Sequence, residues 1–527
     1  MKTGLISLFK IVLFLIQTSL FAQVYNFEGI ITTDTIWQAD TMKITGDVFV
    51  DSAATLNVLP EIYIEFQGHY KIEIKGIIKA LGNEADSIFF AINDTTFHSD
   101  TSTVKGGWHG IRFLSRSPCD TSIFRYCNFK YGKSIIVGSY WQYEIEDNKG
   151  GAIYANNYPA IKISNCSFLN NYALNSGGAV YFYDNNYVNV ENCNFKNNKT
   201  IYKGGGISLV NCDNVFIENN EFIKNIAFHV YAGFAHGLGA AIMSDNPGFS
   251  NTRIINNKCY NNKTLAGTIY ESNLYHTITG NLLCNNFGIA LFNGHSASYG
   301  KYMNNNIINN YYTFLSGMQC SSSNLLINSN IFWNNETYTQ DTMQILFVLN
   351  SNPTVIYNCI QYGQSGEGNI DQNPLFVNPS PGAGLDYHGW LYDWSILDSS
   401  PCINAGTPDT TGLFIPEYDI AGNPRICGFR IDMGAYENQQ FVFIQSSIVS
   451  CKQNNIYPNP GRNKLTIKTT TKNSHFELFD ITGKILLKKF IPDYSTEVNV
   501  SNLPKGMYFY RIYDNKNIIK TGKWVKQ

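Results

Sequence analysis

Charge is scarce in this chain: only 15% of its 527 residues are Asp, Glu, Lys or Arg, while 44% are hydrophobic. No window shows a sustained hydrophobic period of 3.6 residues, which argues against a helical protein. Beyond Ala22, no apolar run approaches the roughly 20 residues that a membrane-spanning helix needs. The nine histidines show no spacing typical of a metal site. The sequence therefore disfavours both a salt-bridged helical enzyme and an integral membrane protein.

The net charge of −2 conceals an uneven distribution. Residues 455–527 hold 13 lysines and arginines against 5 acidic residues, so the longer N-terminal part is net acidic. Because nucleic-acid binding needs a basic face, the sequence disfavours a nucleic-acid partner.

The N-terminal segment predicts export. Residues 1–22 have the pattern of a secretory signal peptide, with an early lysine, an apolar run over residues 11–16, and Ala22 as the small residue at the cleavage point. Lys10 and Gln17 interrupt the apolar stretch, which makes it too short for a membrane anchor. We expect the mature chain to pass through the periplasm and to have no transmembrane segment.

An internal repeat follows the signal peptide. A short element of the form Asn-[Cys/Asn]-x-Phe-x-[Asn/Lys]-Asn recurs at equal intervals, with its phenylalanines at Phe168, Phe195 and Phe222. An earlier copy lies at Phe129, after which the interval is longer. The apolar position then continues, after a second long interval and at nearly equal spacing thereafter, at Cys259, Leu283, Ile307 and Phe332. Short alternating runs separated by Asn and Gly are typical of short strands with turns.

This period predicts the coils of a parallel β-helix, in which equivalent residues stack about 4.8 Å apart. The aromatic rings would form an internal stack, and buried asparagine amides would bridge from coil to coil. Cys127, Cys166 and Cys193 would form a column of small buried residues. The side chains expected in the two main columns are Phe168, Phe195 and Phe222 for the rings and Asn171, Asn198 and Asn225 for the amides.

The Gly-Gly-Ala-[Ile/Val] and Phe-x-x-Asn elements resemble the repeats of chlamydial polymorphic membrane proteins. More broadly, roughly residues 40–370 resemble the right-handed parallel β-helix, or pectate-lyase-like, superfamily, and we expect the β-helix to span residues 23–370. The fold class that this resemblance implies is all-β: a right-handed single-stranded parallel β-helix, followed by a small C-terminal immunoglobulin-like β-sandwich.

A different pattern fills residues 371–437. Asp371-Gln372-Asn373-Pro374 opens it, and residues 399–406, 419–425 and 431–437 continue it with Pro, Gly and Asp at turn positions. This series resembles the module named choice-of-anchor Q. We expect it to cap the open end of the β-helix, whose last coil exposes unpaired strand edges. Cys402 and Cys427 are the likelier disulfide pair within it.

The tail, residues 455–527, follows a linker at residues 438–454. Alternating strands with glycine turns predict a small β-sandwich. Its motifs resemble the type A sorting domain of the type IX secretion system of Bacteroidetes. The resemblance implies contact with that secretion machinery, removal of the tail, and often attachment to surface lipopolysaccharide. The sorting-motif residues are Tyr457, Pro458, Asn459, Pro460, Gly483 and Gly506.

Two insertions are candidate ligand-binding segments, because they fall in the two long intervals of the repeat, before Phe168 and before Cys259. Aromatic rings beside carboxylates or amides suit sugar stacking and hydroxyl recognition; the alternative is that the rings fold back onto the helix. The candidate residues are Tyr140, Trp141, Tyr143, Glu144, His229, Tyr231 and His236.

Catalytic residues are not identifiable from the sequence. A polygalacturonase-like site needs clustered Asp residues, and a pectate-lyase-like site needs acidic Ca²⁺ ligands with a basic residue. No linear motif supplies either, so no metal site is assigned and Ca²⁺ stays open as a cofactor.

The leading hypothesis is an exported adhesin-like or glycan-binding β-helix at the cell surface or secreted, with a polysaccharide or a host or cell-surface molecule as its ligand. The alternatives are a polysaccharide lyase or glycoside hydrolase, and a structural surface-layer component.

Overall fold

The computed structural model describes residues 22–114, 120–138, 145–231, 234–246, 248, 251–294, 299–321, 324–340, 343–349, 351–440, 455–514 and 517–527. The chain divides into two compact units, residues 1–440 and residues 441–527, and each is described by itself. The helical elements within the described ranges are two single turns of 3₁₀ helix, η1 (Glu146–Asn148) and η2 (Gly389–Leu391). No helix in these ranges has the length and apolarity needed to cross a membrane.

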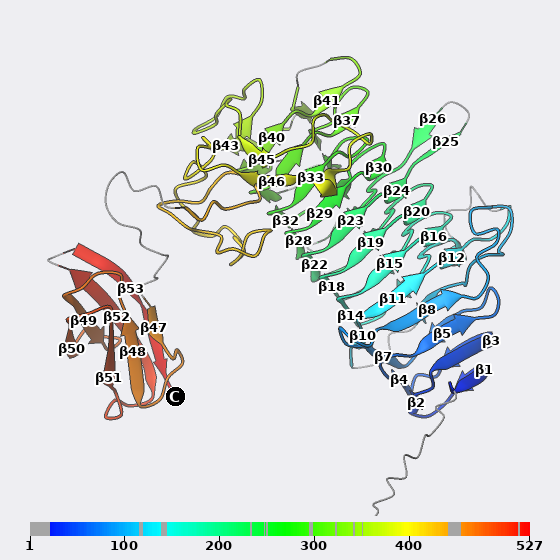
Figure 1. Ribbon diagram of the computed structural model, residues 1–527, viewed down its shortest axis with the longest axis horizontal. Coiled ribbons are helices and arrows are strands. Elements are labelled where there is room, and N and C mark those ends of the chain that lie inside the picture. The colour runs from blue at the N-terminus through cyan, green and yellow to red at the C-terminus, as the bar shows by residue number, and fades with distance from the viewer. Residues whose placement is uncertain are drawn as a thin grey trace, which may run out of the picture. The chain divides into compact units, whose positions relative to one another are not determined.

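The first unit is a stack of coils with three faces (Figure 1). One coil passes through a strand of the first face, β13 (Ile153–Asn156), then of the second, β14 (Ala160–Ser164), then of the third, β15 (Ser167–Leu169). Each strand pairs in parallel with its equivalent in the next coil. This is the architecture of a parallel β-helix, so the predicted all-β fold class is confirmed.

The strands of the first face are β6 (Ile72–Ile74), β9 (Ile111–Leu114), β13, β17 (Val180–Tyr183), β21 (Ile207–Val210), β27 (Ile242–Asp245), β31 (Ile269–Glu271), β34 (Leu291–Asn293), β38 (Met318–Ser321) and β42 (Ile345–Val348). Those of the second face are β2 (Thr35–Trp37), β4 (Thr55–Val58), β7 (Ile77–Leu81), β10 (Ser122–Arg125), β14, β18 (Tyr187–Glu191), β22 (Val215–Glu218), β28 (Thr252–Ile255), β32 (His276–Thr279), β35 (Lys301–Met303), β39 (Leu326–Asn328) and β43 (Thr354–Ile356). Those of the third face are β5 (Tyr63–Phe66), β8 (Ile88–Ile92), β11 (Cys127–Lys130), β15, β19 (Asn194–Lys196), β23 (Glu221–Ile223), β29 (Lys258–Tyr260), β33 (Leu282–Cys284), β36 (Asn306–Ile308), β40 (Ile331–Trp333) and β44 (Cys359–Ile360).

Longer strands open the stack. β1 (Val24–Ile31) and β3 (Thr41–Val50) each run through both the third and the first face. Short strands line the corner between these two faces in later coils: β12 (Lys133–Ser134), β16 (Tyr172–Ala173), β20 (Lys199–Thr200), β24 (Ile226–Ala227), β30 (Lys263–Thr264), β37 (Tyr311–Tyr312) and β41 (Glu336–Thr337).

The register of the third face follows the repeat in the sequence. Phe129 pairs with Phe168, Phe168 with Phe195, and Phe195 with Phe222. The rings are fully buried, and the centroids of successive rings from Phe168 to Phe222 lie 4.7 and 4.8 Å apart. The column continues through Cys259, Leu283, Ile307 and Phe332. The uneven spacings therefore reflect loops between coils and leave the strand register intact.

Asparagine amides form a ladder beside the rings. Nδ2 of Asn171 donates to Oδ1 of Asn198, and Nδ2 of Asn198 donates to Oδ1 of Asn225, both at 2.9 Å. This ladder continues through Asn262, Asn286, Asn310 and Asn335. A second ladder takes over where the Cys127, Cys166 and Cys193 column ends, through Asn220, Asn257, Asn281, Asn305, Asn330 and Asn358. Each buried amide thus finds its partners in neighbouring coils.

A second asparagine often precedes the ladder residue and forms the corner of the coil. Asn170 has a φ of 56° and Asn165 a φ of 53°, which is the left-handed region. Asparagine tolerates this conformation better than other side chains, which explains the recurring Asn-Asn pairs. The corner residue turns the chain, and the next residue supplies the buried amide.

Residues 371–440 lie along the side of the later coils. The two strands of this segment, β45 (Phe376–Asn378) and β46 (Asp393–Ile396), pair with each other in antiparallel orientation. Its buried apolar side chains pack against outward-facing residues of the third face in successive coils, and Figure 1 shows it beside these strands. These coil residues are Ile223, Tyr260, Cys284, Ile308 and Trp333. We predicted an end cap; the contacts instead extend along a flank, because the third face carries outward apolar side chains there. We call residues 371–440 the flank segment.

The second unit contains two small antiparallel sheets. One holds β47 (Asn455–Tyr457), β48 (Lys464–Lys468) and β51 (Ser495–Asn499); the other holds β50 (Ile485–Ile491), β49 (Ser474–Phe479), β52 (Gly506–Asp514) and β53 (Asn517–Lys526). Apolar residues of both sheets share one core around the fully buried Trp524. Of the motif residues, the Pro458 carbonyl accepts the indole N–H of Trp524 at 2.9 Å, and Gly483 takes a φ of 84° in a tight turn.

Candidate functional site

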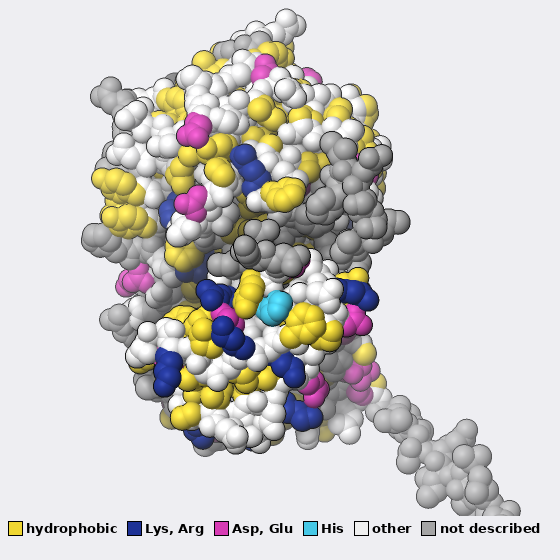
Figure 2. All heavy atoms as spheres, turned by 90° about the vertical axis from the view of Figure 1, so that its left-hand side faces the viewer, with side chains coloured by type: hydrophobic (Ala, Val, Ile, Leu, Met, Phe, Trp, Pro, Cys, Tyr) yellow, Lys and Arg dark blue, Asp and Glu magenta, His cyan; other side chains and the backbone are white. Residues whose placement is uncertain are grey.

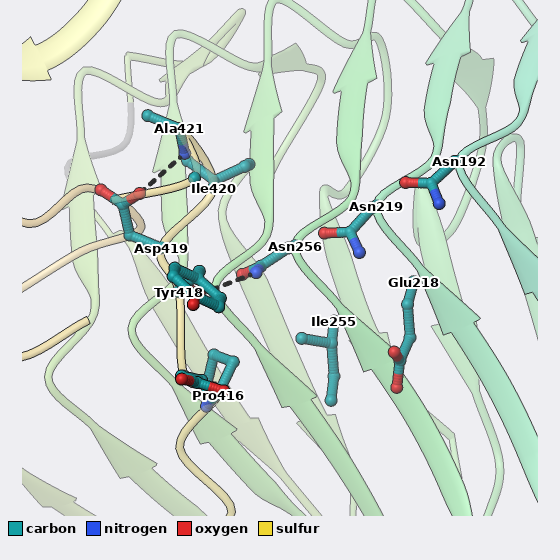
Figure 3. Close-up of a pocket in the computed structure, with 12 residues that line it drawn as sticks. Asn192, Glu218, Asn219, Ile255, Asn256, Pro416, Tyr418, Asp419, Ile420 and Ala421 are labelled. Carbon is teal, nitrogen blue, oxygen red and sulfur yellow. Dashed lines mark hydrogen bonds between the residues drawn. The ribbon is translucent and has the colours of Figure 1, made fainter. Parts of the chain in front are cut away.

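A groove lies at the corner between the second and third faces, beside the edge of the flank segment (Figure 3). Its volume is about 700 Å³. One wall consists of coil-corner residues, and the other is the loop at residues 416–422 of the flank segment. The coil residues that line it are Asn192, Glu218, Asn219, Ile255 and Asn256.

Corner asparagines from three successive coils line up along the groove (Figure 3). Asn192, Asn219 and Asn256 all have left-handed backbone, with φ of 54°, 56° and 53°. The amide of Asn256 is buried and donates through Nδ2 to the carbonyl of Tyr418 at 3.0 Å. Asn192 and Asn219 occupy the equivalent corners but are exposed. The amides of Asn192 and Asn219 therefore face solvent, whereas the equivalent amide of Asn256 in the next coil binds a carbonyl oxygen.

Covered corners elsewhere show what these amides bind. Asn261 donates to the carbonyls of Leu385 and Tyr387 at 3.2 and 2.7 Å. Asn285 donates to the Gly382 carbonyl at 2.9 Å, and Asn304 to the Asp432 carbonyl at 2.8 Å. Amide-to-carbonyl hydrogen bonds from coil corners thus hold the flank segment at several points.

Carboxylates stand on both walls of the groove. Burial raises the pKa of Glu218, and Arg253 partly opposes that shift. The carboxylate of Asp419 on the opposite wall stabilises its own segment: it accepts hydrogen bonds from the backbone N–H groups of Ala421, Asn423 and Glu437 at 3.0, 2.7 and 2.9 Å. Tyr418 is 51% exposed beside it. Besides Asp419, the lining of the groove therefore includes the carboxylates of Glu218 and Glu417, two exposed amides and one aromatic ring.

Residues 93–310 match the family described as right-handed beta helix region. Residues 455–527 match the family described as secretion system C-terminal sorting domain. No curated protein matches the chain.

The sorting domain marks the chain for secretion or attachment at the outer surface by the type IX secretion system. Figure 2 shows Lys and Arg side chains gathered among hydrophobic ones on the face of this domain that it displays. The exposed hydrophobic side chains of the domain include Ile481, Phe490 and Phe509. Mixed basic and apolar surface of this kind suits recognition by a protein partner, here the secretion machinery.

The predicted ligand-binding insertion that contains His229 and His236 lies away from this groove. His229 and His236 pair directly in an antiparallel hairpin of β25 (His229–Tyr231) and β26 (Phe234–His236), which leaves the corner between the third and first faces and extends away from the coils (Figure 1). The His236 ring packs 5.9 Å from that of Tyr202. The structure describes the backbone of Tyr231 but not its side chain, and Tyr140, Trp141, Tyr143 and Glu144 lie outside the described residues.

A cluster of ionisable groups on the first face was not predicted. Nε2 of His109 lies 3.5 Å from Oδ1 of Asp147, and the His109 ring stacks on His69 at 4.7 Å. Buried Arg112 donates to the carbonyl of His109 at 2.8 Å. Burial, followed by the positive charge of Arg112, lowers the pKa of His109 to about 2. The histidine is therefore neutral beside an exposed carboxylate.

Linear motifs could not reveal either site. The groove joins corners from three separate coils to the loop at residues 416–422, much further along the chain, and His109 meets Asp147 from a different coil. The usable sequence signal for the groove is the pair Asn-[Asn/Cys], whose first member forms the corner. Within the described residues, no group of three or more His, Cys, Asp or Glu side chains could hold a metal ion.

Proposed function

We propose that this protein is an exported, adhesin-like glycan-binding β-helix whose groove at Asn192, Asn219 and Tyr418 holds part of a polysaccharide. The observation that carries the proposal is the row of corner amides, exposed in the groove and engaged with carbonyl oxygens beneath the flank segment. Surface polysaccharides of other cells or of a host present such acceptors, together with hydroxyl groups.

The chemistry of the groove suits a sugar chain. Planar amides and a carboxylate recognise hydroxyl groups in pairs, and an exposed tyrosine ring covers the apolar face of a pyranose. The corners repeat once per coil, about 4.8 Å apart, so an extended chain along the stack would meet an amide at each coil. Glu218 would accept hydrogen bonds from hydroxyl groups.

The insertions that contain Trp141 and Tyr231 are proposed as further contacts for longer glycans. Retention through surface lipopolysaccharide is proposed on the sorting-domain resemblance, and residues 371–437 are proposed as a choice-of-anchor Q module. The resemblance to polymorphic-membrane-protein repeats likewise stays a proposal.

A glycan array with the full mature chain tests the proposal, followed by titration of the best ligand. Tyr418→Ala should weaken binding about tenfold, a loss typical of a buried aromatic contact. Asn219→Gly keeps the left-handed corner and removes only the amide, so it should weaken binding about three- to tenfold, as expected for one or two lost hydrogen bonds.

Matched controls separate the groove from the rest of the surface. Asn197 is an exposed asparagine with a φ of 56° at a different corner, and Tyr338 is 77% exposed away from the groove. Asn197→Gly and Tyr338→Ala should bind as the parent does. Equal losses in control and groove variants, or no glycan bound at all, would remove the proposal and favour a structural surface-layer role.

A polysaccharide lyase or hydrolase is the second candidate function, and the cluster of His109 and Asp147 favours it. The Asp147 side chain is half exposed beside the neutral His109, and its carboxylate can take a proton from a sugar carbon or from water. Incubation with acidic polysaccharides, with and without Ca²⁺, should then release unsaturated or reducing ends, and Asp147→Asn should abolish the release.

A further inference from the structure

Two buried thiols meet where the flank segment joins the last coil. Cys359 begins β44, and Cys402 belongs to the flank segment; both are fully buried in one apolar cluster. The neighbouring Cys359 thiol, followed by burial, raises the pKa of the Cys402 thiol well above its ordinary value. The Cys359 thiol also contacts the Gln372 carbonyl at 3.1 Å.

The pairing predicted from the sequence, Cys402 with Cys427, is not the one that the structure brings together. The Cys427 thiol points to the carbonyl of Gln439 at 3.7 Å, and its backbone N–H donates to Glu437 at 3.1 Å. Cys402 finds its neighbour in the coil stack because the flank segment folds back along that stack, which sequence spacing within the segment could not show.

A second group of neighbouring thiols lies inside the coil stack. Cys127, Cys166 and Cys193 stack on neighbouring parallel strands, and the backbone N–H groups of Cys127 and Cys166 donate to the next sulfur at 3.3 and 3.4 Å. Their sulfurs serve as hydrogen-bond acceptors inside the stack. Cys359 and Cys402 instead lie on two separate segments, one of which docks on the other.

We propose that Cys359 and Cys402 form a disulfide bond after export, which fastens the flank segment to the last coil. The compartment through which a sorting-domain protein passes favours disulfides. The flank segment supplies the Tyr418 wall of the groove, so the bond holds that wall in place.

The bond forms by two exchange steps with an oxidised dithiol carrier. One protein thiolate attacks the carrier disulfide, giving a mixed disulfide and one carrier thiol. The second protein thiolate attacks the protein sulfur of the mixed disulfide, forming the Cys359–Cys402 bond and releasing the second carrier thiol. Two electrons and the two thiol protons pass to the carrier. Because both thiols are buried in the finished fold, the exchange takes place before the flank segment closes over the coil.

Mass-spectrometric mapping of the full chain, purified from the periplasm or from culture medium with free thiols alkylated under denaturing conditions, tests the bond directly. The expected result is a linked peptide pair containing Cys359 and Cys402, with Cys127, Cys166 and Cys193 fully alkylated. Alkylated Cys359 and Cys402 in that material, or Cys402 linked to Cys427, would overturn the proposal.

Limited proteolysis gives an independent measurement. Reduction should speed cleavage within residues 371–440 at least about tenfold in the parent chain, because the docked segment opens more often once the crosslink is gone. The Cys359→Ala and Cys402→Ala double variant should be cleaved at the faster rate with or without reductant. Cleavage of the parent that ignores reductant would contradict the bond.

Discussion

Asn198 offers a sharp test of the ladder, because its side chain makes four hydrogen bonds inside the stack. Nδ2 donates to the carbonyl of Phe168 at 3.0 Å and to Oδ1 of Asn225 at 2.9 Å. Oδ1 accepts the backbone N–H of Asn171 at 3.0 Å and its Nδ2 at 2.9 Å. Asn198→Ala leaves four polar groups of neighbouring coils without this partner. At about 1–3 kcal/mol for each buried group left unpaired, and with some of them re-pairing, we expect a loss of about 3–6 kcal/mol in the free energy of unfolding.

Asn198→Asp tests the orientation of the amide, that is, which side of the side chain donates and which accepts. The aspartate keeps the two acceptor contacts to Asn171 but brings a second oxygen against the Phe168 carbonyl and the Asn225 Oδ1, so at pH 7 it should cost more than Ala. Asn197→Gly is the adjacent control and should change stability by less than about 0.5 kcal/mol, because Asn197 is exposed and glycine accepts its φ of 56°. Urea unfolding followed by near-UV circular dichroism measures all three. If Asp is tolerated better than Ala, the amide orientation in the ladder is wrong.

Three further predictions follow from buried groups. The pKa of His109 is about 2 in the folded protein and about 6.5 in the unfolded chain. Below about pH 7, unfolding therefore takes up a proton, and the free energy of unfolding falls as the pH drops. The expected decrease between pH 7 and pH 5 is about 2 kcal/mol. His109→Gln should flatten that slope in pH-dependent urea titrations. Phe195→Ala, which opens the middle of the ring stack, should lower the free energy of unfolding by about 3–5 kcal/mol. Glu271→Ala should cost about 3–5 kcal/mol in the same assay, because the buried carboxylate accepts hydrogen bonds from the Asn273 backbone N–H, the Asn293 amide and the Tyr302 hydroxyl. A loss below about 1 kcal/mol would show that these donors find other partners.

The coil stack could be predicted from the sequence because its rules are local and periodic. Phe168, Phe195 and Phe222 recur at a fixed spacing, and a fixed spacing in a parallel β-helix sets the strand register. In each Asn-Asn pair, the first asparagine indicates a corner of the coil and the second indicates a member of the amide ladder. The export tag was predictable for a related reason, since its motifs are short and ordered along the chain.

The groove and the course of the flank segment could not be predicted, because they depend on docking between distant parts of the chain. Nothing in the residues around Tyr418 shows that its carbonyl will meet Asn256, which lies 162 residues earlier. His109 and Asp147 come together because two loops leave adjacent coils of the first face, while the repeat describes only what faces inward. Both candidate sites therefore depend on contacts between separate segments, which the repeat does not describe.

The corner asparagines serve both the fold of the coils and the contacts of the candidate site. A left-handed corner favours Asn or Gly, although Tyr126, Lys224 and Ser329 also adopt it in this stack, and glycine would satisfy the backbone equally well. Glycine would, however, leave the flank segment without the amides that hold its carbonyls at Asn261, Asn285 and Asn304. The same residue type persists at the exposed corners Asn192 and Asn219, where no segment of the described chain takes up the amide. Exposed asparagines also occupy corners outside the groove, such as Asn165 and Asn197, so the residue type alone does not mark a binding corner. Asn192 and Asn219 differ from these because they line the groove with the loop at residues 416–422.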